Sequence, residues 1–257
     1  METIKNIVAK LEANHEKTKQ VKLLQDLNLL FLHDYMLEID EGLVLYPIEV
    51  EAYYYHEKNF PDTCVHKYKW QQNRYGQLYF HRAGMKDDAA FLYDGGGIDL
   101  CLSYSDSFYL GILIRAAWVN DEEKPICTPG VLTRKVVRHI CQDESIEKVG
   151  AKEAAIIRVL EEKNTIFKLA TNDNRDKGSI VFNSTRFGIS ATNHPEYAQY
   201  RLRSLIELNV PEHPFKAKEK VVLDHMLDNK IEATADNVRM LLGSNSNSIL
   251  EQLKAHS

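Results

Sequence analysis

The class of fold is decided by the stretch Leu43-Val-Leu-Tyr-Pro-Ile-Glu-Val-Glu-Ala-Tyr53, whose side chains alternate in character and are rich in branched residues. This pattern is typical of a β-strand, and Pro47, which has no backbone N–H, indicates an edge strand or a bulge. Runs of similar character follow at 75–80, 89–93, 98–104 and 109–116. Because helices do not separate these runs, the sequence predicts a curved sheet that is antiparallel or mixed.

Helical spacing of apolar residues surrounds this block of strands. Residues 2–17 and 20–36 predict two opening helices, so that 1–36 forms a helical N-terminal part. The same period returns around 131–140 and 151–160. The polar segment 170–179 predicts a loop, whereas 179–189 and 200–206 predict two last ordered segments. The expected class is therefore α+β, with helices flanking the sheet.

A proline-rich break divides the chain into two expected parts. Pro211-Glu-His-Pro214 ends regular structure, which places a main domain at 1–210 and an extension at 211–257. The extension predicts three short helices, with Thr234 as a cap of the second and Gly243 at its end. This order is typical of a helix-turn-helix. The last helix carries a single basic residue, Lys254, so DNA contact and protein-partner docking both remain open.

Composition and charge limit the classes of function. The chain has 257 residues, 27% of them charged, and a formal net charge of −5. An acidic protein is not a broad binder of polyanions, although Lys67, Lys69, Arg74 and His81 are candidates for a local basic face. The apolar runs are short and the first residues do not resemble a signal peptide. We therefore expect a cytoplasmic protein without a membrane span.

Four cysteines, at positions 64, 101, 127 and 141, form no CxxC pair. In an intracellular chain this pattern predicts reduced, partly buried thiols. The spacing of His and Cys matches no common zinc-ligand pattern. The sequence thus predicts neither a metal site nor a cofactor.

The chain from about Leu23 to Leu208 resembles the alkyladenine (3-methyladenine or methylpurine) DNA glycosylases in a series of motifs that occur in the same order. That family has strands reading roughly V-E-T-E-A-Y, Y-V-Y, Y-G-M-x-x-C-x-N and V-L-L-R-A, followed by segments G-P-x-K-L, R-x-G-I and W-R-F. The corresponding segments here are 49–53, 91–93, 97–103, 112–116, 128–133, 186–189 and 200–203, and His66 follows the first strand.

The resemblance implies a hydrolase of base-excision DNA repair that cleaves the N-glycosidic bond of an alkylated or otherwise damaged purine. Such a bond breaks through an oxocarbenium-like sugar, which a carboxylate can stabilise while it activates water. The matching positions imply that Glu51 is this base and that Arg115 orients it. They also imply that the flipped purine is held by three side chains, Tyr53, Tyr93 and His66, with Ser103 lining the pocket.

The loop Asp94-Gly95-Gly96-Gly97 corresponds to the DNA-facing hairpin of that family. Gly96 stands where the family has a bulky residue that fills the gap left by the flipped base, and a glycine cannot do so. Four extra residues also separate Tyr53 from His66. An alternative function is therefore a module that binds a nucleobase, nucleotide or other small ligand without cleaving it. A phosphate cradle is a further alternative, although the glycines lack G-x-G-x-x-G spacing.

Overall fold

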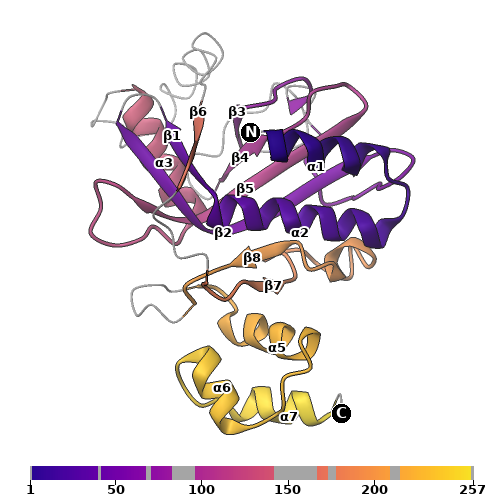
Figure 1. The fold of residues 1–257 in the computed structure, drawn as a ribbon, viewed down its shortest axis with the longest axis vertical. Helices are drawn as coiled ribbons and strands as arrows, with labels where there is room; N and C mark the ends of the chain where they lie inside the picture. The colour runs from indigo at the N-terminus through magenta and orange to yellow at the C-terminus, as the bar shows by residue number, and fades with distance from the viewer. Residues whose placement is uncertain are drawn as a thin grey trace.

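The computed structural model describes residues 2–39, 42–67, 71–82, 96–141, 167–172, 178–208 and 215–255. Within these ranges the fold is α+β, as predicted, with strands joined in one eight-stranded curved sheet (Figure 1). Every described strand pair is antiparallel, and the main order is β3-β4-β5-β2-β1-β6, with β8 pairing with β2 and β7. The strands are β1 (Tyr35–Ile39), β2 (Leu43–His56), β3 (Gln77–Phe80), β4 (Ile98–Cys101), β5 (Phe108–Val119), β6 (Phe167–Thr171), β7 (Phe182–Ser184) and β8 (Arg203–Leu205).

Six α-helices are described, and the last three of them form the C-terminal part of the chain. They are α1 (Glu2–Ala13), α2 (Lys17–His33), α3 (Pro129–Cys141), α5 (Lys218–Asp228), α6 (Ala235–Leu242) and α7 (Asn247–Ala255). Helix α2 packs on β2 and α1 packs on α2, whereas α3 contacts β4 and β5. No helix among the described residues is long and apolar enough to cross a membrane.

The long central strand β2 has two chemically different faces. Val50, Ala52 and Tyr54 are fully buried in the main hydrophobic core. Successive side chains of a strand point to opposite faces, so Glu49, Glu51 and Tyr53 share the other face. The sheet thus places its apolar side in the core and a set of buried polar groups on the reverse.

A bulge in the β2–β5 pair positions an arginine among these polar groups. Glu49 pairs with Ala116 and Val50 pairs with Ile114, which leaves Arg115 without a partner in the register. Bulges of this kind bend a strand and redirect a side chain. Of the two alternatives that Pro47 indicated, the bulge is confirmed, whereas the edge position is wrong because β2 lies between β5 and β1.

Two sequence expectations were wrong at the ends of elements. The predicted helix 20–36 is too long, since α2 ends at His33 and β1 begins at Tyr35. The predicted loop 170–179 begins inside β6, which pairs with β1 over Tyr35 to Ile39. Local pattern could not reveal this pairing because the two strands are far apart in sequence. The predicted strand 89–93 and helix 151–160 lie outside the described residues.

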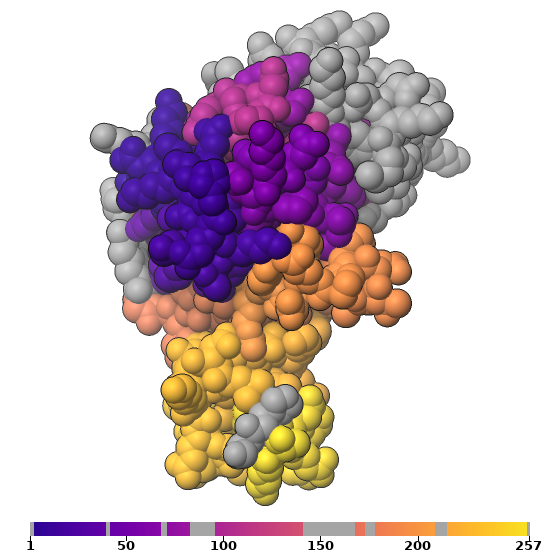
Figure 2. All heavy atoms as spheres, turned by 90° about the vertical axis from the view of Figure 1, so that its right-hand side faces the viewer, coloured from indigo at the N-terminus to yellow at the C-terminus, as the bar shows by residue number. Residues whose placement is uncertain are grey.

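The C-terminal extension is built onto the sheet through α5. This helix packs on β7, and α6 and α7 pack on α5. The hydroxyl of Ser184 donates to Oδ2 of the buried Asp224 at 2.6 Å. As predicted, Oγ1 of Thr234 caps α6, and Gly243 ends it with a φ of 82°. The extension forms a narrower lobe against the main body, coloured yellow in Figure 2.

Candidate functional site

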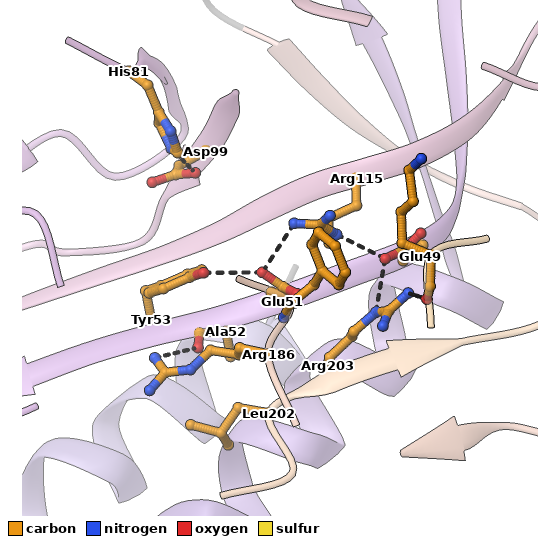
Figure 3. A network of polar contacts seen from close by, with 12 residues as sticks. Glu49, Glu51, Ala52, Tyr53, His81, Asp99, Arg115, Arg186, Leu202 and Arg203 are labelled. Carbon is orange, nitrogen blue, oxygen red and sulfur yellow. Dashed lines mark hydrogen bonds and ion pairs between the residues drawn. The ribbon is translucent and has the colours of Figure 1, made fainter. Parts of the chain in front are cut away.

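A buried network of carboxylates and arginines lies on the polar face of the sheet (Figure 3). Oε1 of Glu49 accepts hydrogen bonds from Nε of Arg115 at 2.7 Å and from Nε of Arg203 at 2.8 Å. Burial raises the pKa of Glu49, against the opposing effect of the two guanidinium groups. This carboxylate therefore anchors both arginines, and Arg115 can approach the neighbouring Glu51 as a positioned cation.

Glu51 is fully buried and its two oxygens are held by three donors. Oε1 accepts the backbone N–H of Phe187 at 2.7 Å. Oε2 accepts the hydroxyl of Tyr53 at 2.9 Å and Nη1 of Arg115 at 3.4 Å. Because Phe187 belongs to the segment 186–189, the network joins three separate motifs of the sequence. The structure thus brings together Glu51, Tyr53 and Arg115, as the resemblance implies.

The face of the Tyr53 ring is covered by an arginine. The guanidinium carbon of Arg186 lies 4.7 Å from the ring centroid, and Nη1 of Arg186 donates to Oδ2 of Asp62 at 2.7 Å. Both side chains of this ion pair are fully buried. Burial and the nearby Glu51 raise the pKa of Tyr53 well above its ordinary range. Tyr53 is therefore a fixed, neutral hydrogen-bond donor to Glu51.

A small cavity of about 80 Å³ opens beside Tyr53. Its described lining combines aromatic and polar side chains: Tyr53, His66, Gln71, His81, Asp99 and Tyr109, with Cys64, Val65, Gly111 and Ile189 completing it. Two of the predicted base-binding residues, Tyr53 and His66, therefore face one cavity. Glu51 lies behind Tyr53, in hydrogen-bond contact with its hydroxyl.

The cavity also contains an imidazole–carboxylate pair. Nε2 of His81 lies 2.8 Å from Oδ1 of Asp99, and the carboxylate is 6% exposed. Asp99 stands in register with Leu113 of β5, which is in turn in register with Glu51 of β2. Figure 3 shows the pair on the far side of β5 from Glu51. Two potential acid–base centres thus lie on one face of the sheet, separated by a strand.

The two histidines of the cavity differ in their electrostatic surroundings. Their ring centroids are 5.1 Å apart and the ring planes are inclined by 63°. Burial and the neighbouring His81 lower the pKa of His66. In His81 burial alone would lower the pKa, but Asp99, by charge and hydrogen bond, raises it overall. The cavity therefore favours the neutral form of His66 and the protonated form of His81.

Of the remaining predicted site residues, the structure describes Ser103, Gly96 and Gly97. Oγ of Ser103 is buried and accepts the backbone N–H of Leu110 at 2.7 Å, an interaction that closes the turn between β4 and β5. Gly96 and Gly97 are buried, and the carbonyl of Gly97 accepts the N–H of His81. Tyr93, Asp94 and Gly95 of the predicted base-binding set and DNA-facing loop are outside the described residues.

The sequence did not indicate Asp99 as a site residue, and it suggested that His81 belongs to a basic surface. Asp99 could have been noticed, because it is a carboxylate inside the apolar run 98–102. His81, a candidate for a basic face, lies in the cavity, because β3 and β4 pair and bring positions 18 residues apart together.

Cys64, Cys101 and Cys127 are free thiols. Burial raises the pKa of Cys64 to about 12 and of Cys127 to about 11, so neither is a ready nucleophile.

Within the described part of the chain, no group of three or more His, Cys, Asp or Glu side chains is arranged to hold a metal ion. The site is therefore built from an ion-pair network around Glu49 and Glu51 and from an aromatic cavity with a His–Asp pair. Comparison with known proteins adds no family to this description, because no family model and no curated protein sequence matches the chain.

Proposed function

We propose that this protein binds a purine-like base of a damaged DNA strand in the cavity beside Tyr53 and hydrolyses its N-glycosidic bond. The observation that carries the proposal is a single contact. The ring of Tyr53 lines the cavity, and its hydroxyl donates to the buried carboxylate of Glu51. A ligand against this ring would therefore lie next to a carboxylate that Arg115 orients. This is the juxtaposition that hydrolysis through a cationic sugar requires.

The size and lining of the cavity support a flat, heterocyclic ligand. A volume of about 80 Å³ is far below that of pockets that enclose a whole nucleotide, which hold roughly 300 Å³ or more. The cavity would therefore take the base of a nucleotide but would not enclose the whole nucleotide. The rings of Tyr53, His66 and Tyr109 offer π-surfaces and edges for contact. Acid–base groups at the edge of the cavity can form hydrogen bonds with ring nitrogens.

The arrangement assigns separate roles to the charged groups. Glu51 would accept a proton from the attacking water and stabilise positive charge on the sugar. Arg115, fixed by Glu49, would hold the Glu51 carboxylate in its orientation. Arg186 would hold the Tyr53 ring at one wall through its contact at 4.7 Å. No metal or cofactor takes part in this scheme.

The second candidate is a binding module that holds a nucleobase or a similar small ligand without cleaving it. One observation favours it: both oxygens of Glu51 already accept hydrogen bonds, from Phe187, Tyr53 and Arg115. For a water to reach this carboxylate, one of these donors must move or share its acceptor. In this candidate the C-terminal helices would bring a protein partner or nucleic acid to the bound ligand.

The experiment that separates the candidates uses oligonucleotides that carry hypoxanthine, 3-methyladenine or ethenoadenine, in single-stranded and double-stranded form. We expect alkali-labile abasic sites with at least one lesion. Glu51→Gln, which keeps the shape of the side chain, should slow their formation by about 10²- to 10⁴-fold. Binding of the free base without formation of abasic sites would support the second candidate. Undiminished cleavage by Glu51→Gln would remove Glu51 from the mechanism.

A further inference from the structure

Two glycines make room for the His81–Asp99 pair. A Cβ atom at Gly111 would lie 3.2 Å from Oδ2 of Asp99. A Cβ atom at Gly97 would lie 2.6 Å from Cδ1 of Leu113 and 3.2 Å from Cε1 of His81. Either substitution would force a neighbouring side chain to move in a close-packed interior. The fold thus provides space for an imidazole and a carboxylate that line the same cavity.

The charged groups around His81 come from several strands. Asp99 on β4 binds its Nε2 atom, and the more distant Glu51 on β2 also favours the protonated ring. Arg115 on β5 opposes protonation, and the ring of His66 stands beside that of His81. The net effect of these groups raises the pKa of His81. The raised pKa favours the protonated ring, which is the form that can donate a proton.

We propose that His81, held by Asp99, is the acid of this site and donates its proton to a ring nitrogen of the heterocyclic base in the cavity. This inference rests on the proposed function and extends it by a second catalytic residue. Glu51, Leu113 and Asp99 are in register on three adjacent strands. Two strand spacings separate the backbones of Glu51 and Asp99 by roughly 10 Å, and His81, which follows β3, lies one strand further out. A sugar with its attacking water can then lie towards Glu51 while the leaving base lies against His81.

The proposed step is balanced in atoms and charge. The bond between C1′ of the sugar and the ring nitrogen breaks, and its electron pair stays with the base. The proton on Nδ1 of His81, the ring nitrogen that is not bound to Asp99, neutralises the base, while water adds to C1′ and gives one proton to Glu51. Transfer of a proton from Glu51 to solvent and from solvent to His81 restores both groups. One water is consumed, and the products are a free base and an abasic sugar.

Two measurements on the full-length protein test this role. The first is the affinity for free hypoxanthine, determined by calorimetry at several pH values. The second is the pH profile of hypoxanthine release from an oligonucleotide under single-turnover conditions. We expect His81→Gln to weaken binding by roughly 10-fold at low pH and to remove the alkaline limb of the release profile. Asp99→Asn should move this limb to lower pH, because the carboxylate no longer raises the pKa of His81.

His66→Gln is the matched control, because His66 is the second imidazole of the cavity and Asp99 is bound by His81. Its release profile should keep the alkaline limb. If His81→Gln keeps the wild-type profile while Glu51→Gln is inactive, the acid role is wrong and the proposed function stands. Weaker binding with an unchanged limb would make His81 a positioning residue and would also overturn the proposal. If the wild-type protein neither binds nor releases any base, both proposals fail.

Discussion

At the scale of single residues, the site depends on buried charges that compensate one another. Glu49 lies between two arginines, Glu51 accepts from three donors, and Asp62 pairs with Arg186. Charges in such positions are stable only when paired, since removal of one partner leaves the other without compensation. Stability and function of this face of the sheet are therefore linked at the same side chains.

The Arg186–Asp62 pair gives the clearest stability prediction at this scale. Both side chains have no exposed area and lie 2.7 Å apart. Arg186→Met should lower the free energy of unfolding by about 3 to 5 kcal/mol, because it leaves the Asp62 carboxylate buried and unpaired. The exposed pair Arg239–Asp236 is the control. Arg239→Met should change the free energy of unfolding by less than about 1 kcal/mol. Equal effects in urea denaturation would contradict this account.

The pH dependence of stability should reveal the raised pKa of His81. A histidine whose pKa is higher in the folded state stabilises the fold below its unfolded pKa, near the ordinary 6.5, and this contribution is lost as pH rises through the folded value. The difference in unfolding free energy between the wild-type protein and His81→Gln should therefore shrink with rising pH. Denaturation between about pH 5.5 and about pH 9 measures it. A difference that grows with pH would show that the pKa of His81 is lowered.

At the scale of elements, the sequence pattern identified some strands and helices and missed others. The alternation of Leu43 to Tyr53 identified β2, and Val131 to Ile140 identified α3. The sequence pattern could not identify β6, because the five residues of this strand depend on pairing with β1. The candidate site was predictable where ordered motifs marked Glu51, Tyr53 and Arg115. It was not predictable where the pairing of β3 with β4 brings His81 to Asp99.

The close packing of β4 on β5 predicts a specific response to an added methyl group. Gly97→Ala should destabilise the protein by about 1 to 3 kcal/mol, because the new Cβ lies 2.6 Å from Cδ1 of Leu113. Leu113→Val in the same chain should recover part of this loss, since it removes the colliding atom. Thermal unfolding of the two single variants and the double variant gives their coupling. Additive effects would show that the two side chains do not meet.

At the scale of the whole molecule, the hydrophobic core is continuous from the sheet into the C-terminal helices. Phe182 of β7, Val222 of α5 and Ile249 of α7 belong to one buried cluster. The boundary expected near residue 210 therefore separates two parts that share a core. A continuous core of this kind normally unfolds as one cooperative unit.

We accordingly expect a single unfolding transition, with coincident curves from far-ultraviolet circular dichroism and tryptophan fluorescence. Removal of residues 211–257 should destabilise the remaining chain, because it uncovers β7 and leaves Ser184 without Asp224. Equilibrium denaturation of the two proteins provides the measurement. Two separate transitions in the intact chain, or an unchanged midpoint after truncation, would contradict this view.

The central claim, hydrolysis of an N-glycosidic bond by a site built on Glu51, is tested most directly by the release of intact free base from a lesion-bearing oligonucleotide, quantified by mass spectrometry. We predict release by the wild-type protein and a rate about 10²- to 10⁴-fold lower for Glu51→Gln at the same concentration. Release at equal rates by both proteins, or no release from any single-stranded or double-stranded substrate, would contradict the claim.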